Sequence, residues 1–365
     1  MELLLNEQQV LLRDAAAKLG AARGGARRAR QLRDARAGID ADAWNEIVAA
    51  GWLSALIAEE RGGLGLGAFD LALALEETGK QVVMTPLIEA AAAVWALAEA
   101  GADADEAMQG TLVVPASGPP GQSYDGKTDG VRLDGGTLSG SLSFVPFADQ
   151  AAAFVVTANE GPATALCLVP RGTNGLSIAT THNVDGSTSS RLVFDRAGLP
   201  ADQVVAKGSK AEAIAAKVNE LLLLGTAVEL LGTAQAALDM TLAYIKLREQ
   251  FGKPIGSFQA LQHRAVNCYV DAELNRSLIF AVLAAWDAGT CHPAMVAAAK
   301  ARASRCALDT MRAALQLHGA IGYTDEHDIG IYYKRAVALA AKYGNEITHV
   351  GRFSELTMPA TSAAG

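Results

Sequence analysis

The stretch REQFGKPIGSFQ, residues 248–259, places polar donors, an aromatic ring and flexible backbone between two apolar segments. Arg248, Gln250 and Gln259 can donate hydrogen bonds, and Phe251 stands next to a glycine. A guanidinium group stays charged and can donate two parallel hydrogen bonds to a phosphate. A simple turn between two helices needs far less than this, so the stretch is a candidate loop for holding a large anionic ligand.

The segments around this loop read as helices. Apolar residues recur three and four positions apart over residues 7–20, 42–56 and 69–82, which is typical of amphipathic helices. From residue 111 the chain changes to short β-rich segments separated by Gly, Asn, Asp and Pro, which predict an antiparallel β-domain. From residue 209 the helical pattern returns, with Pro293 in the first turn of one helix and a further helix over about 329–341.

The predicted fold is therefore mainly α with a β-domain insert. We expect an N-terminal helical domain over residues 1–110, a middle antiparallel β-domain over 111–208 and a C-terminal four-helix-bundle domain over 209–365. The Gly-rich segment ERGGLGLGAFD has a superficial GxGxxG spacing. No strand precedes it, so it predicts a turn and a helix restart rather than a dinucleotide site.

The composition narrows the classes of partner. The chain has 365 residues, a net charge of −8 and a pI near 5.3, which argues against nucleic acid and anionic membrane surfaces as partners. Four scattered cysteines without a CxxC pair are typical of reduced thiols in a cytoplasmic protein. The longest apolar run is broken by Gly and Glu, and no signal-peptide pattern is present, so we expect a soluble protein.

Four motifs resemble one known family. REQFGKPIGSFQALQH and LQLHGAIGYTDEHDIGIYYKRA resemble the two C-terminal signatures of the acyl-CoA dehydrogenases. WNEIVAAGWLSALIAEERGGLGLG and ALEETGKQVVMTPL resemble the N-terminal domain of that family, and the domain order agrees as well. The resemblance implies an FAD flavoenzyme in which a carboxylate takes the α-proton of a CoA thioester while the β-hydride passes to the flavin.

The resemblance also implies which residues contact FAD. In the family's tetramers the C-terminal domain of one subunit reaches the FAD of its neighbour. Arg248 then faces the pyrophosphate, with Gln250 and Phe251 beside it and Phe251 toward the adenosine. A second loop matches the family where small residues allow close backbone approach, although the family usually has Gly-Gly where this chain has Gly-Ala. The remaining implied FAD contacts are Gln259, Gln316, Leu317, His318, Gly319 and Ala320.

Two parts of the family's machinery are missing from the sequence. The β-domain pattern that faces the flavin ring, a Thr-Glu followed by Gly-Ser-Asp, does not occur in LVVPASGPPGQSYDGK. Ser117, Ser123 and Tyr124 remain as possible donors there, but the two adjacent prolines remove backbone donors.

The second missing part is the catalytic carboxylate. Counting from Arg335 places Gly344 where many members carry a Glu, and Leu247 stands where others carry it. Glycine and leucine cannot accept a proton. Glu346 and Glu249 lie nearby in the sequence, but Glu346 is two residues out of place and Glu249 follows the pyrophosphate arginine. We therefore assign no catalytic residue, with Glu346 as the remaining candidate.

This combination resembles the non-catalytic partner subunits of bacterial α2β2 dehydrogenases that act on steroid-CoA thioesters. The predicted partners are a second acyl-CoA dehydrogenase subunit, an acyl-CoA substrate and an electron-transferring flavoprotein as acceptor. Two alternatives stay open: a homotetrameric dehydrogenase with an unusual base, and a flavin-free scaffold that stabilises a partner. The sequence does not specify the acyl group.

Overall fold

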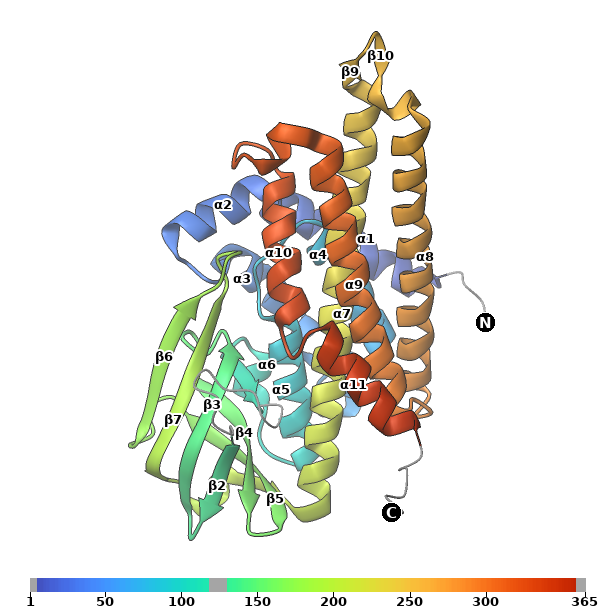
Figure 1. The fold of residues 1–365 in the computed structure, drawn as a ribbon. Helices are drawn as coiled ribbons and strands as arrows, with labels where there is room; N and C mark the ends of the chain where they lie inside the picture. The colour runs from blue at the N-terminus through green and yellow to red at the C-terminus, as the bar shows by residue number, and fades with distance from the viewer. Residues whose placement is uncertain (1–4, 118–129, 359–365) are drawn as a thin grey trace, which may run out of the picture. The chain divides into compact units, whose positions relative to one another are not determined.

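A computed structural model describes residues 5–117 and 130–358 of the chain. Its contacts group into two compact units. One unit comprises residues 1–31, 68–83 and 223–365, and the other comprises residues 32–67 and 84–222. We call the first the bundle unit and the second the sheet unit. The predicted sequence of helical, β and helical segments is confirmed (Figure 1). The domain boundaries near residues 110 and 208 stay a prediction.

The sheet unit is built on an eight-stranded, mostly antiparallel sheet with the order β6-β7-β3-β2-β4-β5-β8, in which β1 pairs with β4 in parallel. Most of its strands alternate buried and exposed residues over part of their length, as expected for a sheet with one face packed against a core. The strands are β1 Val113–Ala116, β2 Gly130–Asp134, β3 Thr137–Pro146, β4 Ala153–Glu160, β5 Ala163–Pro170, β6 Leu176–His182, β7 Thr188–Gly198 and β8 Val204–Lys207.

Short helices accompany this sheet. They are α3 Ala41–Ala49, α5 Leu87–Ala100 and α6 Asp105–Met108. Helix α5 is buried along almost its whole length, and it packs against β1. Asp40 caps α3, because its Oδ1 accepts the backbone N–H groups of Asp42 and Ala43.

The bundle unit consists of long helices. They are α1 Glu7–Arg23, α4 Ala68–Lys80, most of α7 Gly208–Leu247, α8 Gln259–Asp287, α9 Pro293–His318, α10 Ile329–Ala341 and α11 Glu346–Thr357, and α2 Ala26–Ala35 spans the division between the units. Helix α9 contacts α8, α10 and α11, so it is central to this packing.

Glycine lets two of these helices approach closely. A Cβ on Gly232 of α7 would lie 2.2 Å from the backbone oxygen of Glu76 on α4, which is closer than real Cβ contacts allow. Near this crossing, the Glu76 carboxylate accepts two hydrogen bonds of 2.8 Å from Arg276 on α8. The buried Arg335 on α10 pairs with Glu229 on α7 at 3.0 Å. These helices therefore pack with a close backbone contact at Gly232, and the charges buried between them are paired.

Helix α7 is long and apolar enough to meet the criteria for a membrane span. However, 89% of its most apolar window is buried inside the protein. This burial is the pattern of the core helix of a soluble protein.

Candidate functional site

The segment that carries the FAD signature forms a hairpin at the end of α7 and α8 (Figure 1). Strand β9 Glu249–Gln250 pairs with β10 Lys253–Pro254, and the two-residue turn between them is Phe251–Gly252. Both turn residues have positive φ, 54° and 79°, as a type I′ turn requires. The backbone of Arg248 bonds to Tyr244 and to Ile255, which fixes the hairpin to the end of α7.

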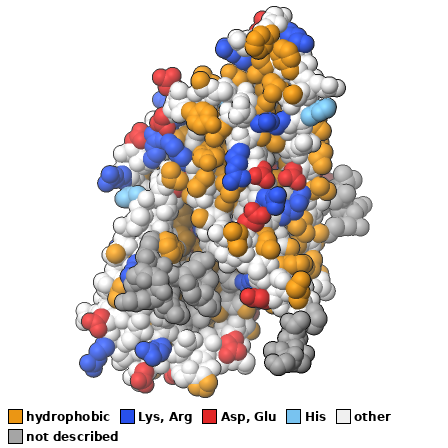
Figure 2. Space-filling model, in the orientation of Figure 1, with side chains coloured by type: hydrophobic (Ala, Val, Ile, Leu, Met, Phe, Trp, Pro, Cys, Tyr) orange, Lys and Arg blue, Asp and Glu red, His pale blue; other side chains and the backbone are white. Residues whose placement is uncertain are grey.

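This hairpin presents its side chains to solvent. Phe251 is 90% exposed, and its ring meets Phe258 edge-on at 6.1 Å. Arg248, Gln250 and Gln259 are also exposed. Among the described residues, the guanidinium group of Arg248 has no hydrogen-bond or ion-pair partner. Figure 2 shows hydrophobic and basic side chains gathered at this tip. The hairpin therefore presents to solvent an aromatic ring and a cation that has no partner among the described residues.

The second predicted loop lies beside the first. Helix α9 ends at His318, and a 3₁₀ turn follows over Gly319–Tyr323. Leu317 is buried in a cluster with Ile245 of α7 and Ala265 of α8, so the ends of three helices meet here. Gln316 and Ala320 are exposed, Gly319 is half-buried, and the side chains of Leu317 and His318 point into the protein.

His318 belongs to a stack of three rings. Its imidazole stacks on Tyr244 at 4.4 Å and lies 4.5 Å from His327. Its Nδ1 lies 2.8 Å from the backbone oxygen of Ala314, which can only accept, so Nδ1 carries the proton. Burial lowers the pKa of His318, and the neighbouring His327 lowers it further. Nε2 of His318 is a buried acceptor without a partner among the described residues.

The two candidate carboxylates, Glu346 and Glu249, lie on separate elements. Glu346 is the first residue of α11, where its negative charge interacts favourably with the helix dipole. Its carboxylate pairs with Arg305 at 3.4 Å. Glu249 is exposed on β9, and Leu247 is 82% exposed at the end of α7. Of the possible flavin-ring donors, Ser117 is half-buried after β1, while Ser123 and Tyr124 lie outside the described residues.

Gly344 occupies the position counted for the family's base, and a side chain there would be strained. Its φ is 103°, and a Cβ there would lie 2.9 Å from Nε2 of His349. The Gly344 carbonyl accepts a hydrogen bond of 3.0 Å from Nζ of Lys300, which also donates to Ala340 and Ser304. A carboxylate at this position would require the backbone and His349 to move.

Lys300 and His349 are buried residues that the sequence reasoning missed. Both have lowered pKa values, mainly because burial penalises their charged forms: the pKa of Lys300 falls to about 7 and that of His349 to about 4. A neighbouring positive charge adds to each effect, since Lys342 lowers the pKa of Lys300 and Lys300 lowers the pKa of His349. Lysine within a helical pattern ordinarily indicates a solvated face, so the sequence held no signal for this burial.

Comparison with known families identifies two matching models. The acyl-CoA dehydrogenase N-terminal domain matches residues 6–107, and the acyl-CoA dehydrogenase C-terminal domain matches residues 224–351. The acyl-CoA dehydrogenase IpdE2 of Mycolicibacterium smegmatis is 30% identical over 345 residues, which cover 93% of this chain and 96% of that protein. IpdE2 of Mycobacterium tuberculosis is 30% identical over 336 residues, or 90% and 91% of the two chains.

Two solved structures are also similar to this chain over nearly its whole length. A variant of the Tcur3481–Tcur3483 steroid ACAD superposes with a TM-score of 0.83 at 27% identity, covering 96% of this chain and 97% of that one. The ChsE4–ChsE5 complex from Mycobacterium tuberculosis shares the fold, with a TM-score of 0.88 at 24% identity and coverage of 99% and 100%. With relatives that match nearly end to end and both domain models in the expected order, the chain belongs to the acyl-CoA dehydrogenase family.

Proposed function

We propose that this chain is the non-catalytic subunit of a heterotetrameric acyl-CoA dehydrogenase and completes the FAD site of its partner. The observation that carries the proposal is the exposed hairpin with Phe251 at its tip and the uncommitted guanidinium of Arg248 at its base. A charged side chain and a large aromatic ring on a rigid turn are suited to bind a ligand that another chain holds.

The chemistry of these residues fits one end of FAD. Arg248 would bind the pyrophosphate, Phe251 would cover the adenosine, and Gln250, Gln259 and Gln316 would supply further hydrogen bonds. The loop at Gly319–Ala320 offers small residues for close backbone approach, while the side chains of Leu317 and His318 point into the protein. The flavin supplies the hydride acceptor when it is bound, and this chain supplies binding and orientation.

The arrangement around Gly344 supports the non-catalytic role. The position counted for the base lacks a carboxylate, and a side chain there would be strained by the positive φ and would displace His349. Glu346 is held by Arg305 at the start of α11. The base therefore comes from the partner, whose catalytic carboxylate acts on the α-proton of the acyl-CoA.

Assembly with another chain is supported by an apolar face on α8. Val266, Tyr269, Val270 and Leu274 recur three and four residues apart, and each is about half exposed. A solved relative at 27% identity pairs two different chains, Tcur3481 and Tcur3483, and is a steroid ACAD. By this likeness we propose a steroid-CoA substrate, and from the family resemblance we propose an electron-transferring flavoprotein as acceptor.

Flavin stoichiometry tests the proposal. The chain should be purified alone and after co-expression with a catalytically complete acyl-CoA dehydrogenase subunit from the same organism. We expect little FAD in the chain alone and about one FAD per heterodimer in the complex, because only one complete site forms per pair. Full FAD with turnover in the isolated chain would show a homomeric enzyme instead. If the Arg248→Ala substitution leaves the FAD content of the complex unchanged, this chain is a scaffold that only stabilises its partner.

A further inference from the structure

A row of polar side chains crosses one face of the sheet unit. Arg132 on β2 pairs directly with Ser139 on β3 and with Asn159 on β4. Directly paired residues point to the same face of a sheet and stand about 5 Å apart. A guanidinium group, a hydroxyl and an amide therefore lie side by side on this face, and all three can donate hydrogen bonds.

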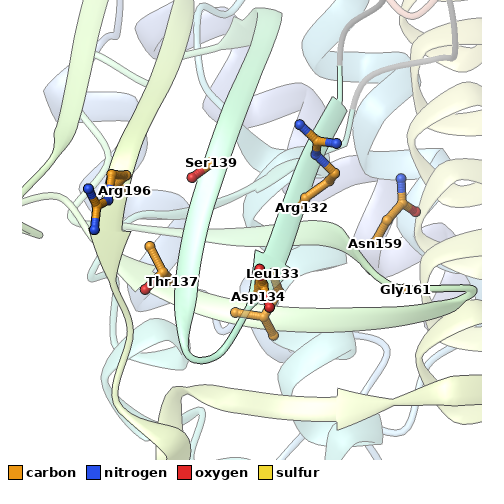
Figure 3. Close-up of a pocket in the computed structure, with 8 residues that line it drawn as sticks. All are labelled: Arg132, Leu133, Asp134, Thr137, Ser139, Asn159, Gly161 and Arg196. Carbon is orange, nitrogen blue, oxygen red and sulfur yellow. The ribbon is translucent and has the colours of Figure 1, made fainter.

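This row forms the floor of a groove. One part, with a volume of about 660 Å³, is lined by the row together with Thr137, Gly161 and Arg196 (Figure 3). A second part of about 770 Å³ shares Arg132, Ser139 and Asn159 and continues to Arg191 and Ser141. The two parts share these residues and make one groove. Its volume is in the range of small-molecule sites.

The groove is positively charged in an acidic protein. Three arginines, Arg132, Arg191 and Arg196, line it against two aspartates, Asp134 and Asp195, while the whole chain has a net charge of −8. Within the described ranges, the guanidinium groups of Arg132 and Arg196 form no hydrogen bond or ion pair. Their charge is therefore available to a ligand.

The two available arginines stand on opposite sides of β3. Figure 3 shows Arg132 and Arg196 on either side of Ser139, with Asp134 nearer the turn that joins β2 and β3. Because β3 lies between β2 and β7, their backbones are two strand spacings, about 10 Å, apart. A ligand with negative groups at two points can contact both arginines at once.

We propose that this groove binds a phosphorylated small molecule of nucleotide size. Arg132 with Asn159 would bind one phosphate group, since a guanidinium fork matches phosphate oxygens. Arg196 would bind the opposite side of the ligand, with the Thr137 and Ser139 hydroxyls between. None of these residues belongs to the FAD signatures, so the site is distinct from the cofactor contacts proposed above and does not depend on them.

Calorimetric titration of the full-length chain with ADP and with inorganic pyrophosphate tests the site. We expect ADP to bind, pyrophosphate to bind more weakly, and both affinities to fall with added salt. Arg132→Gln and Arg196→Gln should each raise the dissociation constant of ADP by roughly tenfold to hundredfold, as for loss of a charge-assisted hydrogen bond. Asp134→Asn should strengthen binding, because it removes a repelling carboxylate.

Two further variants locate the binding. Arg312→Gln, which removes an exposed arginine of α9, should leave ADP binding unchanged. Arg248→Ala tests the hairpin separately, because ADP has the same adenosine and pyrophosphate groups as FAD. Loss of ADP binding in Arg248→Ala, with binding retained in the groove variants, would assign ADP to the hairpin and overturn the proposal. No binding by the unmodified chain, or undiminished binding in the Arg132→Gln/Arg196→Gln double variant, would overturn it as well. Equal affinity for pyrophosphate would refute the nucleotide-sized ligand.

Discussion

The backbone of Arg248 is hydrogen-bonded in the hairpin, whereas its guanidinium group has no partner among the described residues. A substitution of the side chain can therefore test ligand binding without removing the backbone hydrogen bonds. Arg248→Ala should weaken FAD binding by the complex by about 1.5–3 kcal/mol, since a charge-assisted phosphate contact is lost. This corresponds to a roughly tenfold to hundredfold rise in the dissociation constant. Arg248→Lys should recover part of the affinity, because an ammonium group keeps the charge but not the fork.

Fluorescence titration of the apo-complex with FAD measures this effect. Arg312→Ala is the matched control, because that arginine is exposed on α9 and pairs with Asp309. An unchanged dissociation constant in Arg248→Ala would mean that the hairpin only joins two helices.

Glu346 is the residue that decides whether this chain performs catalysis. Its carboxylate pairs with Arg305 at the start of α11, so Glu346→Gln should leave the turnover of the complex nearly intact. Loss of a general base ordinarily slows a reaction by about 10²–10⁴-fold. Steady-state turnover with FAD content measured in parallel gives the answer, and Glu249→Gln is a second carboxylate variant for comparison. A collapse of turnover at full FAD content in Glu346→Gln would identify Glu346 as the base.

His349 should make folding sensitive to acid. Its pKa is lowered to about 4 in the folded chain, first by burial and then by the charge of Lys300, from the ordinary 6.5. Between these values the unfolded chain binds a proton that the folded chain does not bind, so stability falls as the pH drops from 6.5 to 4. The loss approaches about 3 kcal/mol at the acid end. The lowered pKa of Lys300 acts in a different window, between about 7 and 10.5.

Urea denaturation across pH 4–7 tests this linkage. His349→Gln should flatten the pH dependence in that window, whatever its effect on stability at pH 7. His263→Gln, at an exposed position of α8, should keep the slope of the unmodified chain. An equally steep slope in His349→Gln would assign the acid sensitivity to other groups.

At the scale of elements, alanine substitutions at two helical glycines should have opposite effects on stability. Gly232→Ala should destabilise the bundle unit by about 1–3 kcal/mol, because its Cβ would collide with the backbone of α4. Gly351→Ala should stabilise α11 by about 0.5–1 kcal/mol, since no atom lies within 4 Å of a Cβ there and alanine favours helix. Urea midpoints compare the two. A neutral Gly232→Ala would show that α4 and α7 separate readily.

Several elements were predictable because their signals are local. Helix α10 covers Ile329–Ala341 as the periodicity predicts, and Pro293 occupies the first turn of α9. The sequence predicts a loop at the hairpin but not paired strands, because the turn requires a positive φ at Phe251, where a bulky residue is unfavourable. The burial of Lys300 depends on carbonyl groups 40 and 44 residues away, which no local pattern reports.

At the scale of the whole molecule, assembly should depend on the apolar face of α8. Val270→Glu and Leu274→Glu place a carboxylate on a half-exposed surface, so each should fold normally as a single chain. In an interface the buried, unpaired charge would cost several kcal/mol, and the complex should dissociate. Sedimentation velocity of the co-purified subunits measures this. Leu11→Glu, at an exposed position of α1, should leave the complex intact. Unchanged sedimentation of the α8 variants would place the interface elsewhere.

The exposed hairpin has a genetic consequence in the proposed assembly. A substitution at Arg248 or Phe251 would leave its own chain folded and abundant, since both side chains project into solvent. The damage would appear as loss of flavin from a polypeptide encoded by a different gene. Selection on these codons would therefore act through the cofactor of another protein. An intact copy of this gene supplied in trans should restore the yellow flavin to the partner without any change in the partner's own sequence.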